Sequence, residues 1–445
     1  MVRDAYSLGK RPTAFDRDFL PFAQPMIGPE EIREVVSVLK SRWITTGPKT
    51  RQFETAFAEY VGCKHAIAVN SCTAALHLAL EAIGTQRGDK IVTSPMTFTA
   101  TSEVMTYLGA RPLFVDIDPA TMNMDVTRLE ELLKKTFSPH RRPSLKAILP
   151  VHYGGYPCPM DEILRLAREY GIKVIEDAAH AFPAYYRGRL IGTIGDVTCF
   201  SFYATKTITT GEGGMITTDE DSLAERMRIM SLHGISKDAW KRYRADGSWY
   251  YEVIAPGFKY NLTDMAAALG LAQLKRATAF RQRRAAIAQK YDQTFAKMEE
   301  IEIPGGERDV FHNPPSSDGR NLHSWHLYVI KLKPGRLSIA RDDFIEELRQ
   351  RGIGASVHFI PLHIHPYYRK TYGFKPEDFP VAYQIYKQII SLPIYPGMSN
   401  HDVRRVIDSV RDIVARNRRT ILPGRKGPTA DRTNGRYQFP SPKCE

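Results

Sequence analysis

The chain has 445 residues, of which 43% are hydrophobic and 25% are charged. These values are typical of folded globular proteins and exclude a disordered polymer, and the length allows more than one domain. No apolar stretch approaches the roughly 18 residues that a membrane-spanning helix needs. The five cysteines form no C-x-x-C pair. This argues against a disulfide framework or a zinc ribbon and predicts reduced thiols in the cytoplasm.

The formal net charge of +13 favours an anionic partner. The basic residues are spread over predicted helical segments such as 276–290 and are not interleaved with exposed aromatic residues. This distribution is typical of solvated helix faces, so we expect neither a nucleic-acid nor a membrane partner.

In chain order, we expect residues 1–18 to form an N-terminal extension, and a regular alternation of predicted strands and helices begins near residue 64. Amphipathic segments such as 73–83 and 160–171 separate short β-branched runs, a pattern that predicts an α/β fold with a mostly parallel sheet between helices. We expect one large domain over 19–280. Its predicted strands are 64–70, 90–95, 111–117, 146–152, 173–178, 196–202 and 213–218.

The long helical pattern at 263–298 exceeds what a single crossover requires, so it predicts a bridge to a second domain. A loop rich in Gly, Pro and Ser follows at 303–320, and then come a predicted strand at 323–332 and a helix at 340–352. These elements predict a smaller C-terminal α+β domain over 281–420. The closing segment 421–445 is dense in breakers and basic residues, which predicts a flexible tail.

Two side chains that could take part in a reaction lie at or just after the ends of predicted strands. Asp177 closes an apolar strand, and open α/β sheets bind ligands beyond the carboxyl ends of their strands. A buried carboxylate at that edge needs a cationic partner. Lys206 follows the next apolar strand, where desolvation would lower the pKa of its ammonium and make the amine a nucleophile for a carbonyl.

A third element joins a strand to the start of a helix. Ser71, Cys72 and Thr73 would direct backbone N–H groups and the helix dipole toward a phosphate. With Lys206 holding an aldehyde and Asp177 pairing with a pyridine nitrogen, the three elements describe a pyridoxal 5'-phosphate site. Each has an ordinary alternative when taken alone: a surface lysine, a helix-capping aspartate and a plain N-cap turn.

With these residues in place, the chain resembles the DegT/DnrJ/EryC1/StrS family of sugar aminotransferases, which are fold type I pyridoxal-phosphate enzymes. The resemblance extends from about residue 19 to 415. It rests on blocks that occur in family order: WITTGPKT (43–50), NSCTAALHLAL (70–80), SPMTFTAT (94–101), VHYGG (151–155), EDAAHA (176–181), SFYATKTITTGEGG (201–214), PGFKYNLTDMAAALGLAQL (256–274) and SLPIYPGMS (391–399).

The resemblance implies three catalytic residues. Lys206 matches the Schiff-base lysine, Asp177 the partner of the pyridine nitrogen, and His180 the residue beside the phenolic oxygen of the cofactor. Similar dehydratases replace the lysine with histidine, so Lys206 favours transamination. The implied reaction moves an amino group from L-glutamate to the 4-keto position of a nucleotide-linked sugar. A 3-keto-sugar or cyclitol aminotransferase and a non-catalytic cofactor-binding regulator are the alternatives.

Further contacts are implied at positions that match the family's motifs. Phe98 would stack on the cofactor ring and Ser201 would meet the phosphate, while Asn261 would reach the phosphate of a partner subunit, which implies a homodimer with shared sites. Two positions depart from the commonest pattern: Cys72 replaces a glycine, and Leu262 replaces an arginine. The variant KYNLTD is most similar to the branch that aminates UDP-4-keto-pentose sugars.

Two loops supply candidate substrate contacts. His358 falls in a segment that the resemblance places at the nucleotide-sugar cleft. His363 and His365 lie close to it, but no carboxylate or cysteine stands at ligand spacing, so we expect no metal. The segment 235–254 mixes basic and aromatic residues that suit a nucleoside diphosphate, and Trp240 and Arg242 are its candidate contacts. An ordinary surface loop explains that segment equally well.

Overall fold

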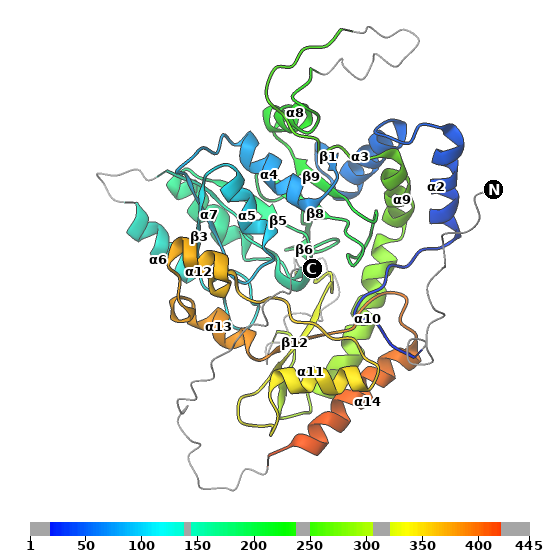
Figure 1. Cartoon of the computed structure of the whole chain (residues 1–445), viewed down its shortest axis with the longest axis vertical. Coiled ribbons are helices and arrows are strands. Elements are labelled where there is room, and N and C mark those ends of the chain that lie inside the picture. Colours follow the sequence, from blue (N-terminus) through cyan, green and yellow to red (C-terminus); the bar gives the residue numbers. More distant parts are fainter. Residues whose placement is uncertain (1–17, 138–143, 237–249, 306–320, 420–445) are drawn as a thin grey trace, which may run out of the picture.

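The computed structural model describes residues 18–137, 144–236, 250–305 and 321–419. Its centre is a seven-stranded sheet with the strand order β1-β9-β8-β5-β4-β2-β3 (Figure 1). All seven strands expected from the sequence are present. Their bounds are β1 (His65–Val69), β2 (Lys90–Thr93), β3 (Arg111–Phe114), β4 (Leu145–Ile148), β5 (Lys173–Asp177), β8 (Val197–Ser201) and β9 (Gly214–Thr218).

The sheet is mostly parallel, as predicted. Strands β3, β2, β4, β5 and β8 run in one direction, whereas β9 is antiparallel to both of its neighbours, β8 and β1. The chain reverses between β8 and β9 without a crossover helix, and Ser201 pairs with Gly214 at the end of this reversal. The reversing segment carries Lys206 and therefore lies at the carboxyl ends of the parallel strands.

Helices cover both faces of the sheet, which gives three layers. One face packs against α4, α5 and α8, and the other packs against α3, α6, α7 and α9. Apolar side chains alternate between these two cores along each strand, as expected for a sheet covered on both faces. The helices are α2 (Pro29–Ser41), α3 (Pro48–Val61), α4 (Cys72–Ala82), α5 (Ala100–Tyr107), α6 (Val126–Thr136), α7 (Met160–Tyr170), α8 (Asp221–Met230) and α9 (Asp264–Lys275).

The helical pattern predicted over 263–298 is divided into two helices, α9 and α10 (Ala277–Phe295), which meet at Arg276. Arg276 leaves the helical ladder with φ −102° and ψ −3°. Its guanidinium donates to Glu31 at 2.9 Å and lies 4.6 Å from the centre of the Phe280 ring. The bond to Glu31 connects this break to the distant helix α2, and the local sequence pattern does not encode that contact.

The C-terminal part has its own apolar core, formed by α10, α11, α14 and a three-stranded antiparallel sheet. The expected strand 323–332 begins only at Tyr328, because the N–H groups of Ser324 and Leu327 donate to the carbonyls of Gly155 and Gly154. The division into domains at 280/281 stays a prediction. The remaining elements are β6 (Tyr185–Tyr186), β7 (Arg189–Leu190), β10 (Ile301–Glu302), β11 (Tyr328–Leu332), β12 (Ile389–Leu392), α11 (Arg341–Gln350), α12 (Pro366–Tyr372), α13 (Pro380–Tyr386), α14 (Asn400–Asn417) and the 3-10 turns at Tyr153–Gly155, Leu362–Ile364 and Pro376–Asp378.

The start of the described chain packs on the C-terminal part. Leu20 forms a parallel bridge with Ile353, its N–H donates to Gly352 O at 2.8 Å, and its carbonyl accepts from Gly354 N at 2.8 Å. The sequence pattern gave no indication of this contact. In the described ranges, no helix has the length and apolarity to cross a membrane.

Candidate active site

Lys206 lies in the reversal between β8 and β9, and its backbone N–H donates to Tyr203 O at 2.9 Å. Burial of the side chain lowers the pKa of its ammonium to about 8, although the neighbouring Cys72 and Asp177 oppose this shift. About a tenth of the amine is therefore unprotonated at pH 7, far more than for an exposed lysine. This is the state that attacks a carbonyl carbon.

Asp177 is the last residue of β5, and the residue is 5% exposed. Oδ2 accepts a hydrogen bond from Thr101 Oγ1 at 2.7 Å, and Oδ1 accepts from the N–H of Ala179 at 3.1 Å. Burial raises the pKa of Asp177, while these two donors and the charge of Lys206 lower it in part. Within the described part of the chain, no side chain forms an ion pair with this carboxylate, so a protonated ring nitrogen would supply the cationic partner that a buried carboxylate needs.

Ser71 is the N-cap of α4 and accepts a hydrogen bond from Ala74 N through its hydroxyl at 3.1 Å. The N–H groups of Cys72 and Thr73 open the helix, so they have no acceptor within it and are available to an anion. Gly214 lies so close that a Cβ there would come within 2.6 Å of the Ser71 carbonyl carbon. Because Gly214 pairs with Ser201, both phosphate-contact candidates lie at one place.

His180 follows β5 and is buried. Its Nδ1 accepts the backbone N–H of Gly154 at 3.3 Å, and its ring stacks on Phe359 with centroids 5.6 Å apart. A second imidazole, His326, lies 4.4 Å from it between centroids. Burial and the charge of Lys206 hold the pKa of His180 well below its usual value, so the ring is neutral.

Phe98 is 60% exposed and faces Phe359, with 6.2 Å between the ring centroids. Phe359 also stacks on His180, so Phe98 and His180 share one aromatic neighbour. The stacking of Phe98 on a cofactor ring stays a prediction. Asn261 forms a bridge with Val69, two residues before Ser71, and its amide donates to Thr46 Oγ1 at 2.6 Å in the same chain. Its predicted role in a partner subunit's site is untested.

The three histidines of the 354–369 loop have different surroundings. His358 is half-buried, and its Nδ1 lies 2.9 Å from Ser391 Oγ, whereas His365 bonds to Ile360 O and His363 is fully buried beside Phe379. Burial, together with the charge of Lys206, lowers the pKa of His358 to about 4. Among the residues that the structure describes, no group of three His, Cys, Asp or Glu could hold a metal ion.

Trp240 and Arg242 lie outside the described residues, so their predicted substrate contacts stay predictions. Conversely, the structure brings Thr101, His326 and Phe359 to the site, and the sequence reasoning assigned no role to any of them. All three fall inside or beside segments that the sequence reasoning singled out. Only the fold shows which residue of each segment contacts Asp177 or His180.

The residues present fit pyridoxal phosphate. Asp177 would hold the ring nitrogen, the start of α4 with Ser201 would hold the phosphate, and Lys206 would bind the aldehyde carbon. When bound, the cofactor withdraws electrons from the carbon that carries the amino group.

Comparison with known proteins supports this assignment. Residues 25–411 match the model of the DegT/DnrJ/EryC1/StrS aminotransferase family. The spore coat polysaccharide biosynthesis protein SpsC of Bacillus subtilis is 51% identical over 397 residues, which cover 89% of this chain and 97% of SpsC. An uncharacterized protein of Methanocaldococcus jannaschii is 52% identical over 400 residues, covering 90% of this chain and 99% of that protein.

Solved structures agree with the sequence matches. A putative sugar aminotransferase from Streptococcus pneumoniae, solved in its PLP form, is 32% identical with a TM-score of 0.77 and covers 89% of this chain and 99% of its own. Helicobacter pylori PseC, an aminotransferase of pseudoaminic acid biosynthesis, is 28% identical with a TM-score of 0.79, covering 89% and 100%. The chain therefore belongs to the DegT/DnrJ/EryC1/StrS aminotransferase family and is a pyridoxal-phosphate-dependent aminotransferase of fold type I.

Proposed function

We propose that the protein transfers an amino group from L-glutamate to the 4-keto position of a nucleotide-linked sugar. The product is a nucleotide amino-sugar for polysaccharide, lipid or antibiotic biosynthesis. The observation that carries the proposal is an amine of lowered pKa, Lys206, beside a buried carboxylate, Asp177, in a family that includes sugar aminotransferases. The similarity to SpsC, a polysaccharide biosynthesis protein, supports a sugar product.

In this function each site residue has a distinct task. Lys206 would bind the cofactor aldehyde, and its amine, once freed by the amino donor, would be the base that takes and returns the substrate proton. Asp177 would hold the protonated ring nitrogen, and the neutral His180 ring would offer its Nε2–H to the phenolic oxygen. Ser71, Cys72, Thr73 and Ser201 would hold the phosphate, and Phe98 would cover the ring.

His358 is the proposed sugar contact within the described part of the chain. Its lowered pKa keeps the imidazole neutral, so it can exchange hydrogen bonds with hydroxyl groups without a competing charge. Trp240 and Arg242 are proposed to bind the base and the diphosphate. Replacing His358 with Asn should raise KM for the sugar and leave the reaction with L-glutamate unchanged.

The visible absorption spectrum tests the reaction class and the amino donor. The native protein should show a band that requires Lys206 and that L-glutamate removes, while Lys206→Ala should not respond. NMR of the product then separates a 4-amino sugar from a 3-amino sugar or an aminated cyclitol. A protein that keeps its band with every amino donor would instead be a cofactor-binding regulator.

We propose a homodimer as the working assembly. Helix α2 exposes apolar residues at spacings of four and three, with Ile32 57%, Val36 39% and Leu39 51% exposed. An apolar stripe of this kind suits the twofold contact of a second copy. Leu39→Glu should weaken self-association in sedimentation experiments, whereas Lys40→Glu on the same helix should not.

Shared sites give the dimer a functional test. Lys206→Ala and Asn261→Ala chains, each inactive alone, should regain part of the activity when subunits exchange, because one mixed site would then hold both native residues. No recovery after confirmed exchange would show that Asn261 serves its own chain. A cytoplasmic location, expected from the thiols, stays a prediction.

A further inference from the structure

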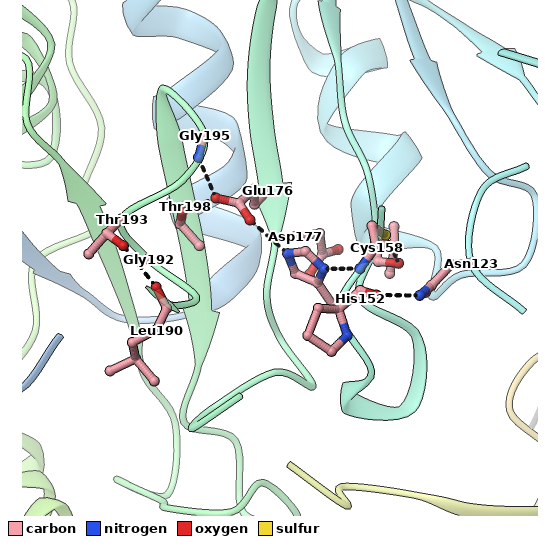
Figure 2. Close-up of polar contacts among 12 residues, drawn as sticks. Asn123, His152, Cys158, Glu176, Asp177, Leu190, Gly192, Thr193, Gly195 and Thr198 are labelled. Carbon is pink, nitrogen blue, oxygen red and sulfur yellow. Dashed lines mark hydrogen bonds and ion pairs between the residues drawn. The ribbon is translucent and has the colours of Figure 1, made fainter. Parts of the chain in front are cut away.

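Glu176 precedes Asp177 on β5 and points to the other face of the strand, away from Lys206. Its side chain is fully buried. Oε1 accepts hydrogen bonds from Gly195 N at 2.7 Å and from Thr198 Oγ1 at 2.8 Å, and Oε2 lies 2.9 Å from His152 Nε2 (Figure 2). This carboxylate therefore takes three donors from three different elements.

His152 lies between β4 and the turn Tyr153–Gly155, directly before the turn, and is also fully buried. Its Nδ1 accepts the backbone N–H of Cys158 at 3.0 Å, so the ring proton that faces Glu176 is on Nε2. Figure 2 shows the imidazole between these two partners. The amide of Cys158 thus selects the tautomer of His152, and Glu176 selects its orientation.

The backbone of His152 forms hydrogen bonds with Asp177 of the proposed active site and with the turn that follows it. Its N–H donates to Asp177 O at 3.2 Å, and its carbonyl accepts from Gly155 N at 3.1 Å, which closes the tight turn Tyr153–Gly155. Within that turn, the N–H of Gly154 donates to His180 Nδ1. Because Nδ1 is an acceptor, the ring proton of His180 is on Nε2.

We propose that Glu176 and His152 are positioning residues: together they orient the turn whose Gly154 N–H fixes the tautomer of His180. Neither residue touches the proposed cofactor site. The consequence for the reaction rests on the proposed role of His180 at the cofactor, whereas the consequence for the His180 ring does not.

Glu176→Gln tests the proposal with almost no change of shape. The glutamine amide has one acceptor oxygen for three donors. If its NH₂ faces His152, the NH₂ group meets the Nε2–H of His152, and both are donors. If His152 changed tautomer to avoid this, its Nδ1–H would instead meet the N–H of Cys158. If the NH₂ faces Gly195 and Thr198, the Thr198 hydroxyl can turn to accept from it, but the Gly195 N–H loses its acceptor. Thr198→Val is the matched control, because it removes a donor to Glu176 on the side away from His152.

Two substitutions of His152 separate its partners. His152→Asn keeps an acceptor near Cys158 N but is too short to reach Glu176, whereas His152→Gln places a donor near the position of Nε2. We therefore expect His152→Gln to preserve the orientation of the turn and His152→Asn to lose it. If Glu176→Gln does not fold, the comparison of His152→Gln with His152→Asn tests the same proposal.

The decisive readout is the tautomer of His180 in cofactor-free protein, measured by NMR with ¹⁵N-labelled histidine and assigned with His180→Gln. The native chain, Thr198→Val and His152→Gln should show an unprotonated Nδ1, and Glu176→Gln and His152→Asn should show a mixture. In single turnovers of the cofactor-loaded protein with L-glutamate, Glu176→Gln and His152→Asn should be slower than the native protein by up to about 100-fold. Thr198→Val should remain near the native rate.

An unchanged His180 tautomer in Glu176→Gln and in His152→Asn would overturn the proposal and leave the pair a part of the core. A mixed tautomer with an unchanged rate would support the positioning role and would instead contradict the proposed function of His180. The experiment therefore distinguishes failure of the positioning role from failure of the proposed function of His180.

Discussion

Thr101 Oγ1 donates a hydrogen bond to Asp177 Oδ2 over 2.7 Å, and the same oxygen lies 2.7 Å from the hydroxyl of Thr97. Because Thr101 gives its proton to the carboxylate, Thr97 must donate to Thr101. The two hydroxyls form a short chain that ends on Asp177 and stabilises its charged form in a buried site. The geometry thus connects α5 to the carboxylate that would hold the cofactor.

Replacing Thr101 with Val should raise the pKa of Asp177 further, because it removes a donor to the charged form. A hydrogen bond to a charged group contributes about 1.5 to 3 kcal/mol, so the affinity for pyridoxal phosphate should fall by roughly tenfold or more. Absorption titrations with the cofactor at several pH values measure this. Thr93→Val is the control, since Thr93 donates to Leu149 O and is equally buried. An unchanged affinity in Thr101→Val would contradict the prediction.

The lowered pKa of Lys206 predicts a pH dependence in the cofactor-free protein. The unprotonated amine is the nucleophile, so the rate of its reaction with pyridoxal phosphate should rise with pH and level off above about 8. Stopped-flow absorption measures the rate, and Lys206→Ala gives the background. A rate that keeps rising toward pH 10 would mean that the side chain behaves as an ordinary surface lysine.

Asp264 should be important for stability as well as for the site. Its buried carboxylate accepts from the N–H groups of Gly47, Lys49 and Thr50 and from the Thr50 hydroxyl. Asp264→Ala leaves these donors without an acceptor, so the free energy of unfolding should fall by about 2 to 3 kcal/mol.

Asp125→Ala removes an exposed N-cap of the ordinary kind on α6 and should cost only about 1 kcal/mol. Urea denaturation compares the two variants. Thr46, which accepts from the Asn261 amide, directly precedes Gly47, whose N–H donates to Asp264. Only Asp264→Ala should therefore also weaken cofactor binding. Equal effects of the two substitutions on cofactor binding would rule out this coupling.

His358 should make the protein sensitive to acid. Its pKa of about 4 in the folded chain is below the value of the unfolded chain, so the unfolded state binds more protons between pH 6.5 and 4. Stability is therefore lost as the pH falls through this window. His358→Asn should lose less stability between pH 7 and 4 than the native protein in thermal unfolding. A larger loss in the variant would contradict this sign.

Much of the fold could be predicted from the sequence, because alternating strands and helices have distinct hydrophobic periods. The position after a predicted strand was enough to predict a site role for Lys206, Asp177 and the turn at Ser71. Thr101 and Glu176 could not be assigned in the same way. Their roles depend on which face of a strand or helix they occupy, and on partners about 76 and 24 residues away in the chain.

The contact of Leu20 with Gly352 and Gly354 has a consequence for the order of folding. The partners are separated by more than 330 residues, so the cost in chain entropy is recovered only after most of the protein is in place. During synthesis, the segment around Leu20 cannot form this contact until Gly352 and Gly354, which follow helix α11, have been synthesised. We therefore expect this N-terminal segment to be among the last parts of the chain to become protected from hydrogen exchange.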